Sequence, residues 1–314
     1  MGLQSRYPGV LNVAYNPQLV VSRAPHIKIK VETTRQIMGE VMLALLPAAL
    51  FGVYLFGANS AAVILSAVGG AVVTEAVFQR RLTGLTALVG DGSAALTGLL
   101  LALTLPPSIS PGYAAAGGVA AILFGKVLQG GLGRNLFNPA LVGRALMLVI
   151  WPAAMTTWVS PVDGTSAATA LGGGEFTVQA LFLGTVPGSI GETSALFLLA
   201  GALFLWFRSR IEWRIPLMFI LGALVTALLF GADPLVHMLG GGLMIGALYM
   251  ATDWVTSPMT RSGKVIFGIG CGVLTVLIRE LGRFPEGITY SILLMNAVVP
   301  LLDRYLKRKA LGEA

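Results

Sequence analysis

The chain has 314 residues, of which 55% are hydrophobic and only 11% are charged, and its mean hydropathy is +0.81. An ordinary soluble domain carries about 25% charged residues, and the few polar residues here could not cover so much Leu, Val and Ala in a soluble fold. The composition therefore excludes a soluble domain and predicts an all-α integral membrane protein. The net charge of +7 does not indicate nucleic-acid binding, because the basic residues lie singly or in short groups between apolar runs.

Apolar runs divide the chain into two sets of five. Residues 1–39 are mixed polar without a signal-peptide pattern, and we predict them to be a cytoplasmic leader. The runs of the first set, within residues 40–155, are 41–55, 61–78, 88–105, 113–128 and 139–150. The polar excursion 156–191 separates them from a second set within residues 192–303, namely 192–207, 215–230, 235–250, 265–278 and 288–302, and a basic tail, 304–314, ends the chain. Since about 20 apolar residues cross a bilayer, we predict about ten transmembrane helices.

The distribution of basic residues predicts the orientation. If the N-terminus is cytoplasmic, alternate connections hold all 21 Lys and Arg residues except Arg279 and Arg283. The positive-inside rule then places both termini in the cytoplasm and the excursion 156–191, which contains no Lys or Arg, outside it. Five spans on each side of this loop imply two inverted halves, and we expect broken helices near residues 91–93 and 252–258, where Asp stands among Gly, Ser or Thr.

Motifs of soluble enzymes are absent from the sequence. The single Cys271 can form neither a disulfide nor an iron–sulfur cluster within this chain, and we interpret it as an inert core thiol. The only imidazoles are His26 and His237, for which we expect no catalytic role, and no metal site is predicted.

Small polar residues fill the segment Asp163-Gly164-Thr165-Ser166-Ala167-Ala168-Thr169 within the excursion. By itself the pattern fits a Ser/Thr-rich turn that caps a helix. It also suits covalent attachment of a redox carrier, because Thr169 offers a hydroxyl and its small neighbours leave room for a modifying enzyme. Asp163 either orients that hydroxyl or forms an Asx-turn.

This segment resembles the flavinylation motif of the D subunit of Rnf complexes and the B subunit of sodium-translocating NADH:quinone reductases (Nqr). Ala167 stands where Gly is common in that motif. The chain length favours the Rnf D subunit over the longer Nqr B subunit. Further stretches similar to the family span most of the chain, namely 91–107, 130–140, 188–194 and 250–260, with 285–287 and 293–297 after them.

The resemblance implies FMN bound to Thr169 through a phosphoester, with Asp163, Ser166 and Ala168 as motif residues, and a second, non-covalent flavin such as riboflavin. It implies a membrane subunit of an Rnf-type complex that couples electron transfer between ferredoxin and NAD to Na⁺ or H⁺ translocation across the inner membrane of a bacterium or archaeon. The expected partners are a flavin transferase, a second flavin-bearing subunit and iron–sulfur subunits. The sites for NAD and ferredoxin are expected on partner subunits.

Two further stretches are candidates for a flavin pocket. Gly188, Ser189 and Gly191, with Glu192 and Thr193, would open the sixth helix with exposed backbone amides, which suit either a flavin or phosphate contact or ordinary N-capping. Asn138 before Pro139 is typical of an N-cap. In the family these residues lie near the flavin-bearing core, so Asn138 is also a candidate contact to the second flavin.

Three carboxylates, Glu75, Asp91 and Asp253, lie in or beside apolar runs, where ionisable groups are costly. They are candidates for contact with the transported ion or proton. The alternatives are that the two Asp residues cap helix starts and that Glu75 pairs with Arg80 or Arg81.

Two other functions stay open at this point. One is the quinone-reducing Nqr-type B subunit. The other is a non-redox transporter or channel in which the two Asp-containing breaks form the pathway and the Thr169 loop is unmodified. Flavin content distinguishes the second of these from a redox subunit.

Overall fold

The computed structural model describes residues 20–21, 27–28, 32–83, 91–161, 164–174, 176–191, 194–282 and 287–306. Helices dominate this part of the chain, in agreement with the predicted all-α fold. The strands within it are the two-residue segments β1 (Val20–Val21) and β2 (Ile27–Lys28), which pair antiparallel.

The first group of helices follows the predicted apolar runs closely. Its members are α1 (Thr34–Phe56), α2 (Ala58–Thr83), α3 (Ser93–Leu103), α4 (Pro111–Ile122) with its π-helical continuation η2 (Leu123–Val127), and α5 (Pro139–Ile150). Helix α1 begins earlier than its apolar run and takes in residues that we predicted as leader. The Thr33 hydroxyl oxygen explains this start, because it accepts a hydrogen bond from the Gln36 amide at 3.2 Å and so caps the helix.

The polar excursion holds three short helices, α6 (Pro152–Met155), η3 (Ala170–Gly172) and α7 (Val178–Leu183). The second group comprises α8 (Ala195–Phe207), α9 (Arg214–Leu229), α10 (Pro234–Leu239), α11 (Leu243–Ile245), the π-helical η4 (Gly246–Met250), α12 (Arg261–Gly282) and α13 (Gly287–Tyr305). The predicted run 235–250 is thus not one helix. Gly241 and Gly242, with φ of +59° and +74°, turn the chain between α10 and α11 in a conformation that other residues rarely adopt.

Membrane length is reached by three helices of the described part: Thr34–Phe56, Ala58–Phe78 and Arg261–Gly282. Four shorter helices are also strongly apolar, namely Ser93–Leu103, Pro139–Ile150, Ala195–Phe207 and Arg214–Leu229. Helices occupy each of the ten predicted runs, but the number that crosses a bilayer stays a prediction.

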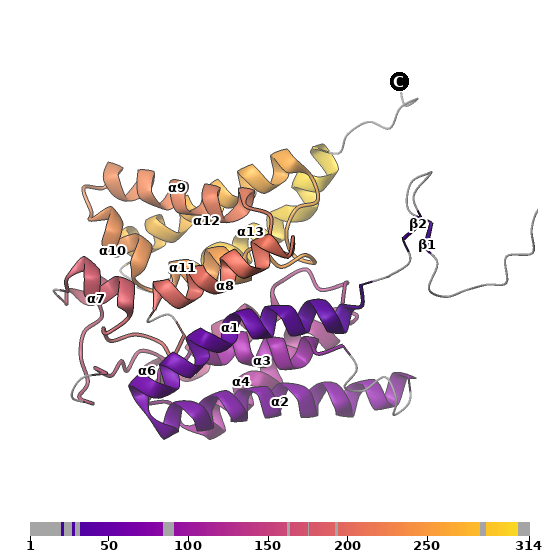
Figure 1. Cartoon of the computed structure of the whole chain (residues 1–314), viewed down its shortest axis with the longest axis horizontal. Coiled ribbons are helices and arrows are strands. Elements are labelled where there is room, and N and C mark those ends of the chain that lie inside the picture. The colour runs from indigo at the N-terminus through magenta and orange to yellow at the C-terminus, as the bar shows by residue number, and fades with distance from the viewer. Residues whose placement is uncertain are drawn as a thin grey trace, which may run out of the picture.

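The two groups form two layers of roughly aligned helices, with α1 to α4 in one and α8 to α13 in the other (Figure 1). The short helices α6 and α7 lie at one end of these layers, and the start of α1 and the end of α13 lie at the other. The core is continuous between the layers, because Ala44, Leu45 and Ala48 of α1 belong to the same buried cluster as Leu198 and Leu205 of α8.

One close helix pair recurs in both groups. Helix α2 packs on α4 and α9 packs on α12, each through a glycine that lets two backbones touch. A Cβ atom at Gly118 would lie 2.2 Å from the carbonyl oxygen of Ala67, and one at Gly272 would lie 2.2 Å from that of Phe219. The two glycine contacts are equivalent, which indicates a structural repeat.

A second contact supports the repeat. The Thr74 hydroxyl donates to the carbonyl of Gly70 at 2.7 Å, and the Thr226 hydroxyl donates to the carbonyl of Gly222 at the same distance. Gly70 and Thr74 lie three and seven residues after Ala67, which the packed glycine of α4 touches. Gly222 and Thr226 likewise lie three and seven residues after Phe219.

Candidate functional site

The segment that carries Thr169 folds back on itself as a small two-stranded loop. Val159 and Ser166 form an antiparallel bridge, with the Ser160 amide donating to Thr165 at 2.9 Å and the Ala167 amide donating to Trp158 at 3.1 Å. Main-chain hydrogen bonds therefore hold this loop although its side chains are small. Asp163 of the predicted motif lies outside the described residues.

Thr169 itself is the N-cap of η3. Its side-chain oxygen accepts a hydrogen bond from the Gly172 amide at 3.2 Å, and its carbonyl accepts from the amides of Gly172 and Gly174. The capping turn expected for this sequence is thus present, and Thr169 is half-buried, whereas Ser166 and Ala168 are exposed. Because the oxygen only accepts here, its own proton remains available for substitution.

The turn between α10 and α11 supports this loop. A Cβ atom at Gly241 would lie 2.3 Å from the Leu171 side chain, so Leu171 is seated directly against that glycine. Arg279 holds the same turn, since its guanidinium donates to the carbonyls of His237 at 2.8 Å and Gly241 at 2.8 Å. Arg279 was not among the predicted site residues, although it is one of the two basic residues that we predicted on the non-cytoplasmic side.

His237 lies beside this arrangement. Its Nε2 is 3.0 Å from a carboxylate oxygen of Glu280. The pair joins α10 to α12 next to the Arg279 contacts.

The stretch 188–191 is arranged differently from our expectation. We predicted exposed amides, but the Ile190 amide donates to the carbonyl of Leu105 at 3.1 Å and the Gly191 amide donates to Leu103 at 2.8 Å. Ser189 is fully buried. These residues pack against the end of α3 because its last carbonyls need partners. The other two residues assigned to this stretch, Glu192 and Thr193, lie outside the described residues.

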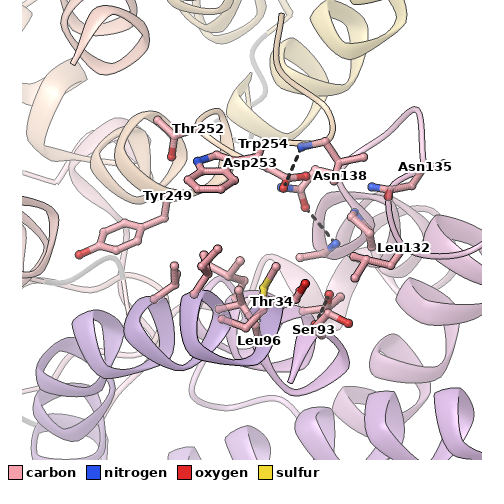
Figure 2. Close-up of a pocket in the computed structure, with 18 of the residues that line it drawn as sticks. Thr34, Ser93, Leu96, Leu132, Asn135, Asn138, Tyr249, Thr252, Asp253 and Trp254 are labelled. Atoms are coloured by element: carbon pink, nitrogen blue, oxygen red, sulfur yellow. Dashed lines mark hydrogen bonds between the residues drawn. The ribbon is translucent and has the colours of Figure 1, made fainter. Parts of the chain in front are cut away.

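A cavity of about 340 Å³ lies between the two helix layers. Figure 2 shows Thr34, Ser93 and Leu96 along one side and Tyr249, Thr252, Asp253 and Trp254 along the other, with Leu132, Asn135 and Asn138 closing one end. Its walls are mainly apolar, with a few polar groups converging on it. That composition and size are typical of a site for an organic ligand.

Asn138 lines this cavity and also acts as the predicted helix cap. Its Oδ1 accepts hydrogen bonds from the amides of Ala140 at 3.0 Å and Leu141 at 3.4 Å, and Pro139 follows at the first helical position. One side-chain N–H donates to the carbonyl of Met250 at 3.1 Å. The capping interpretation is confirmed, and the carboxamide has a second N–H that can donate a hydrogen bond.

Asp253 lines the cavity on the opposite side. It accepts hydrogen bonds from the Thr256 hydroxyl at 3.0 Å and the Val255 amide at 3.5 Å. Burial raises the pKa of this carboxyl, and those two hydrogen bonds only partly oppose the shift. Of the three candidate carboxylates, Asp253 is the one that touches the cavity directly.

The other two carboxylates, Glu75 and Asp91, are linked through the buried Lys126, Glu75 directly and Asp91 through Ser93. Glu75 pairs with Lys126 of η2, because α2 lies against the end of α4. The side chains of Arg80 and Arg81, our alternative partners for Glu75, lie outside the described residues. The Lys126 ammonium also donates to the Ser93 hydroxyl, which donates in turn to Asp91 at 2.7 Å. Asp91 accepts from the Ser93 amide at 2.9 Å as well, which is the helix-start role that we gave as the alternative for it.

A second cation borders the cavity. Arg210 donates through Nη1 and Nη2 to Glu32, at 2.6 and 3.1 Å, and through Nε to Glu40. Hydrogen bonds to Glu32 and then Glu40 raise its pKa. These contacts tie the connection between α8 and α9 to the start of α1.

The two sites lie at opposite ends of the bundle. Helix α5 starts at the cavity with its Asn138 cap and leads to the Thr169 loop at its other end, and its 12 residues span about 18 Å. Among the described residues, no group of three or more His, Cys, Asp or Glu is arranged to hold a metal. Cys271 is buried and free.

Comparison with known proteins covers nearly the whole chain. A family model described as the NQR2, RnfD, RnfE family matches residues 20–312. The chain is 47% identical over 311 residues to the D subunit of the proton-translocating ferredoxin:NAD(+) oxidoreductase complex of Clostridium ljungdahlii, a match that covers 91% of this chain and 93% of that protein.

Two further relatives are similar over comparable lengths. The D subunit of the Na(+)-translocating ferredoxin:NAD(+) oxidoreductase complex of Acetobacterium woodii is 44% identical over 305 residues, with 94% and 95% coverage of the two chains. The D subunit of the ion-translocating oxidoreductase complex of Stutzerimonas stutzeri is 42% identical over 325 residues, with 88% and 92% coverage.

Proposed function

Because the chain belongs to the NQR2, RnfD and RnfE family, we propose that it is a flavin-carrying membrane subunit of an Rnf-type complex. Such a complex is a redox-driven ion translocase that moves electrons between ferredoxin and NAD. The observation that carries this proposal is the similarity of almost the entire chain to D subunits of complexes named for that reaction.

The residue proposed to carry covalent FMN is Thr169. Its hydroxyl stands at a half-exposed turn, and the exposed neighbours Ser166 and Ala168 leave space for a flavin transferase. Attachment replaces the hydroxyl proton with a bond to phosphorus and releases one water relative to free FMN. When bound, the flavin supplies one- and two-electron chemistry that no amino-acid side chain of this chain offers.

The cavity is proposed to hold the second, non-covalent flavin, such as riboflavin. Its apolar walls suit a planar aromatic ring, and polar groups of Asn138, Asp253 and Lys126 converge on it. These residues would orient the ring and exclude water from it. The cavity is therefore a better candidate than the stretch 188–191, whose amides at Ile190 and Gly191 already have partners.

The proposed membrane arrangement is ten crossings in two inverted halves, 40–155 and 192–303. The recurring helix pairs, α2 with α4 and α9 with α12, support the repeat. The positive-inside distribution supports cytoplasmic termini and an extracytoplasmic Thr169 loop in the inner membrane of a bacterium or archaeon. The cavity would then lie toward the cytoplasmic side.

Electrons would enter at Thr169 from a flavin on a neighbouring subunit and return to the cytoplasmic side through the cavity. Iron–sulfur partners and the chains that bind ferredoxin and NAD would complete the route. Two relatives of similar identity belong to complexes named for different ions, protons in one and Na⁺ in the other. Similarity alone therefore leaves both ions as candidates.

The test is the intact mass of the denatured subunit after expression with a flavin transferase. We expect the wild-type chain and Thr165→Val, a control in the same loop, to gain one FMN less one water, and Thr169→Val to gain nothing. An unmodified wild-type chain beside a competent transferase would contradict the flavin claim and favour a non-redox transporter. A modified chain whose complex reduces quinone without ferredoxin would instead favour the Nqr-type function.

A further inference from the structure

A buried lysine lines the cavity. Lys126 is 2% exposed, and both Lys126 and its hydrogen-bond partner Ser93 line the cavity. Glu75, the carboxylate partner, is not a lining residue and lies on α2 behind them. Of the two members of this ion pair, the lysine is therefore at the cavity wall and the carboxylate is behind it.

The local backbone accounts for this orientation. Lys126 belongs to the π-helical turn η2, and such turns are frequent at functional sites. Gly125 beside it is pressed against the start of α5, since a Cβ atom there would lie 2.6 Å from the Cα of Pro139. This close approach brings Lys126 to the same wall as the Asn138 cap.

The other charged groups at the cavity are less able to act on a ligand. Arg210 forms ion pairs with both Glu32 and Glu40. Asp253, on the opposite side of the cavity, is a carboxyl group and supplies no positive charge. Asp91 accepts its hydrogen bonds from Ser93 and does not line the cavity. Lys126 is thus the cavity-lining cation that is paired with Glu75, whereas Arg210 is held by two carboxylates.

We propose that the Lys126–Glu75 pair sets the reduction potential of the flavin in the cavity. The proposal rests on the proposed function, specifically on a non-covalent flavin at this position. Reduction adds negative charge to the ring system, and a nearby ammonium in a low-dielectric site stabilises that charge. Glu75 weakens the effect by standing behind the ammonium, so each partner moves the potential in the opposite direction.

The test uses the full-length chain carrying Thr169→Val, so that the only flavin remaining is the one in the cavity. Glu75→Gln keeps the shape of the side chain and removes the opposing charge. We expect it to raise the midpoint potential, measured by spectroelectrochemistry. The double variant Glu75→Gln with Lys126→Met replaces the pair by neutral groups and is expected to lower the potential below that of Glu75→Gln.

Each step should change the equilibrium between oxidised and reduced flavin at least tenfold, which is about 30 mV for a two-electron couple. Lys126→Arg retains the cation and should stay within threefold of the parent. A matched control is Glu212→Gln with Lys264→Met, an ion pair that joins the α8–α9 connection to α12 and does not line the cavity. A general loosening of the fold would not raise the flavin potential in Glu75→Gln and lower it again when Lys126→Met is added.

The outcomes distinguish failure of this inference from failure of the proposed function. Flavin bound at full occupancy with potentials within threefold in all variants would overturn this inference and leave the proposed function intact. Absence of flavin from the Thr169→Val chain would overturn both the cavity assignment and the inference, while the mass measurement on Thr169 would stand independently. If the double variant does not fold, Glu75→Gln alone decides the sign.

Discussion

The backbone amide of Asn138 donates a hydrogen bond to the side-chain oxygen of Asn296, 3.2 Å away, across 158 positions of the chain. The side-chain nitrogen of Asn296 donates to the carbonyl of Thr256 at 2.9 Å. Both asparagines are buried, and the contact joins the start of α5 to α13 and to the segment after η4. The end of the cavity is therefore held by an amide network between the two halves.

Replacing Asn296 by Leu should destabilise the protein. The Asn138 amide and the Thr256 carbonyl would each lose a buried partner, at about 1–3 kcal/mol for each group. Thermal unfolding in detergent would show a lower midpoint. The neighbouring change Met295→Leu keeps apolar volume and should have a small effect, and equal losses for the two variants would contradict the network.

The two equivalent glycines should be similarly intolerant of a methyl group. Gly118→Ala and Gly272→Ala would each press a Cβ atom against a backbone carbonyl at 2.2 Å, so both should lower stability by at least about 1–3 kcal/mol. Gly69→Ala in α2 meets nothing within 4 Å and should be neutral or stabilising. Fluorescence-detected size-exclusion chromatography after heating would compare the three, and a tolerated Gly272→Ala would argue against the repeat.

Asp253 should make stability depend on pH. Burial raises its folded-state pKa above its ordinary value of 3.8, so the folded state binds a proton more tightly than the unfolded state. Its contribution is therefore fully present below about pH 4 and is lost as pH rises toward the folded pKa. Compared with Asp253→Asn, the wild-type chain should lose relative thermal stability as the pH rises above about 4 and through the folded-state pKa. A difference that is constant with pH, or that grows in the opposite direction, would contradict this assignment.

Substitution of Gly241 should affect the loading of flavin on Thr169, although Gly241 contacts Leu171 and not Thr169. Gly241→Ala would strain a backbone at φ +59° and push Leu171 away, which displaces η3 and its N-cap. We expect lower flavin occupancy on Thr169, measured by intact mass. Gly231→Ala is the matched control, because it also has a positive φ, +71°, but meets nothing within 4 Å. Equal occupancy in both variants would show that the α10–α11 turn does not position the loop.

Local signals in the sequence determined much of the helix pattern. The predicted run 139–150 coincides with α5, because an Asn cap followed by Pro defines a helix start within a few residues. The polar excursion with Thr169 at a turn was predictable for the same reason, since Gly and small polar residues favour turns over spans. Long apolar runs likewise required helices, whatever their partners.

Tertiary structure alone decided how distant residues meet. Glu75 pairs with Lys126, 51 positions away, because helix packing brings α2 against η2. Packing also ties the amides at 190–191 to the end of α3 and seats Leu171 beside Gly241. The cavity is made by side chains from both layers, so no single segment encodes it. Sequence determines contacts within a few residues through backbone geometry, whereas a site between layers exists only after burial of apolar surface has brought those layers together.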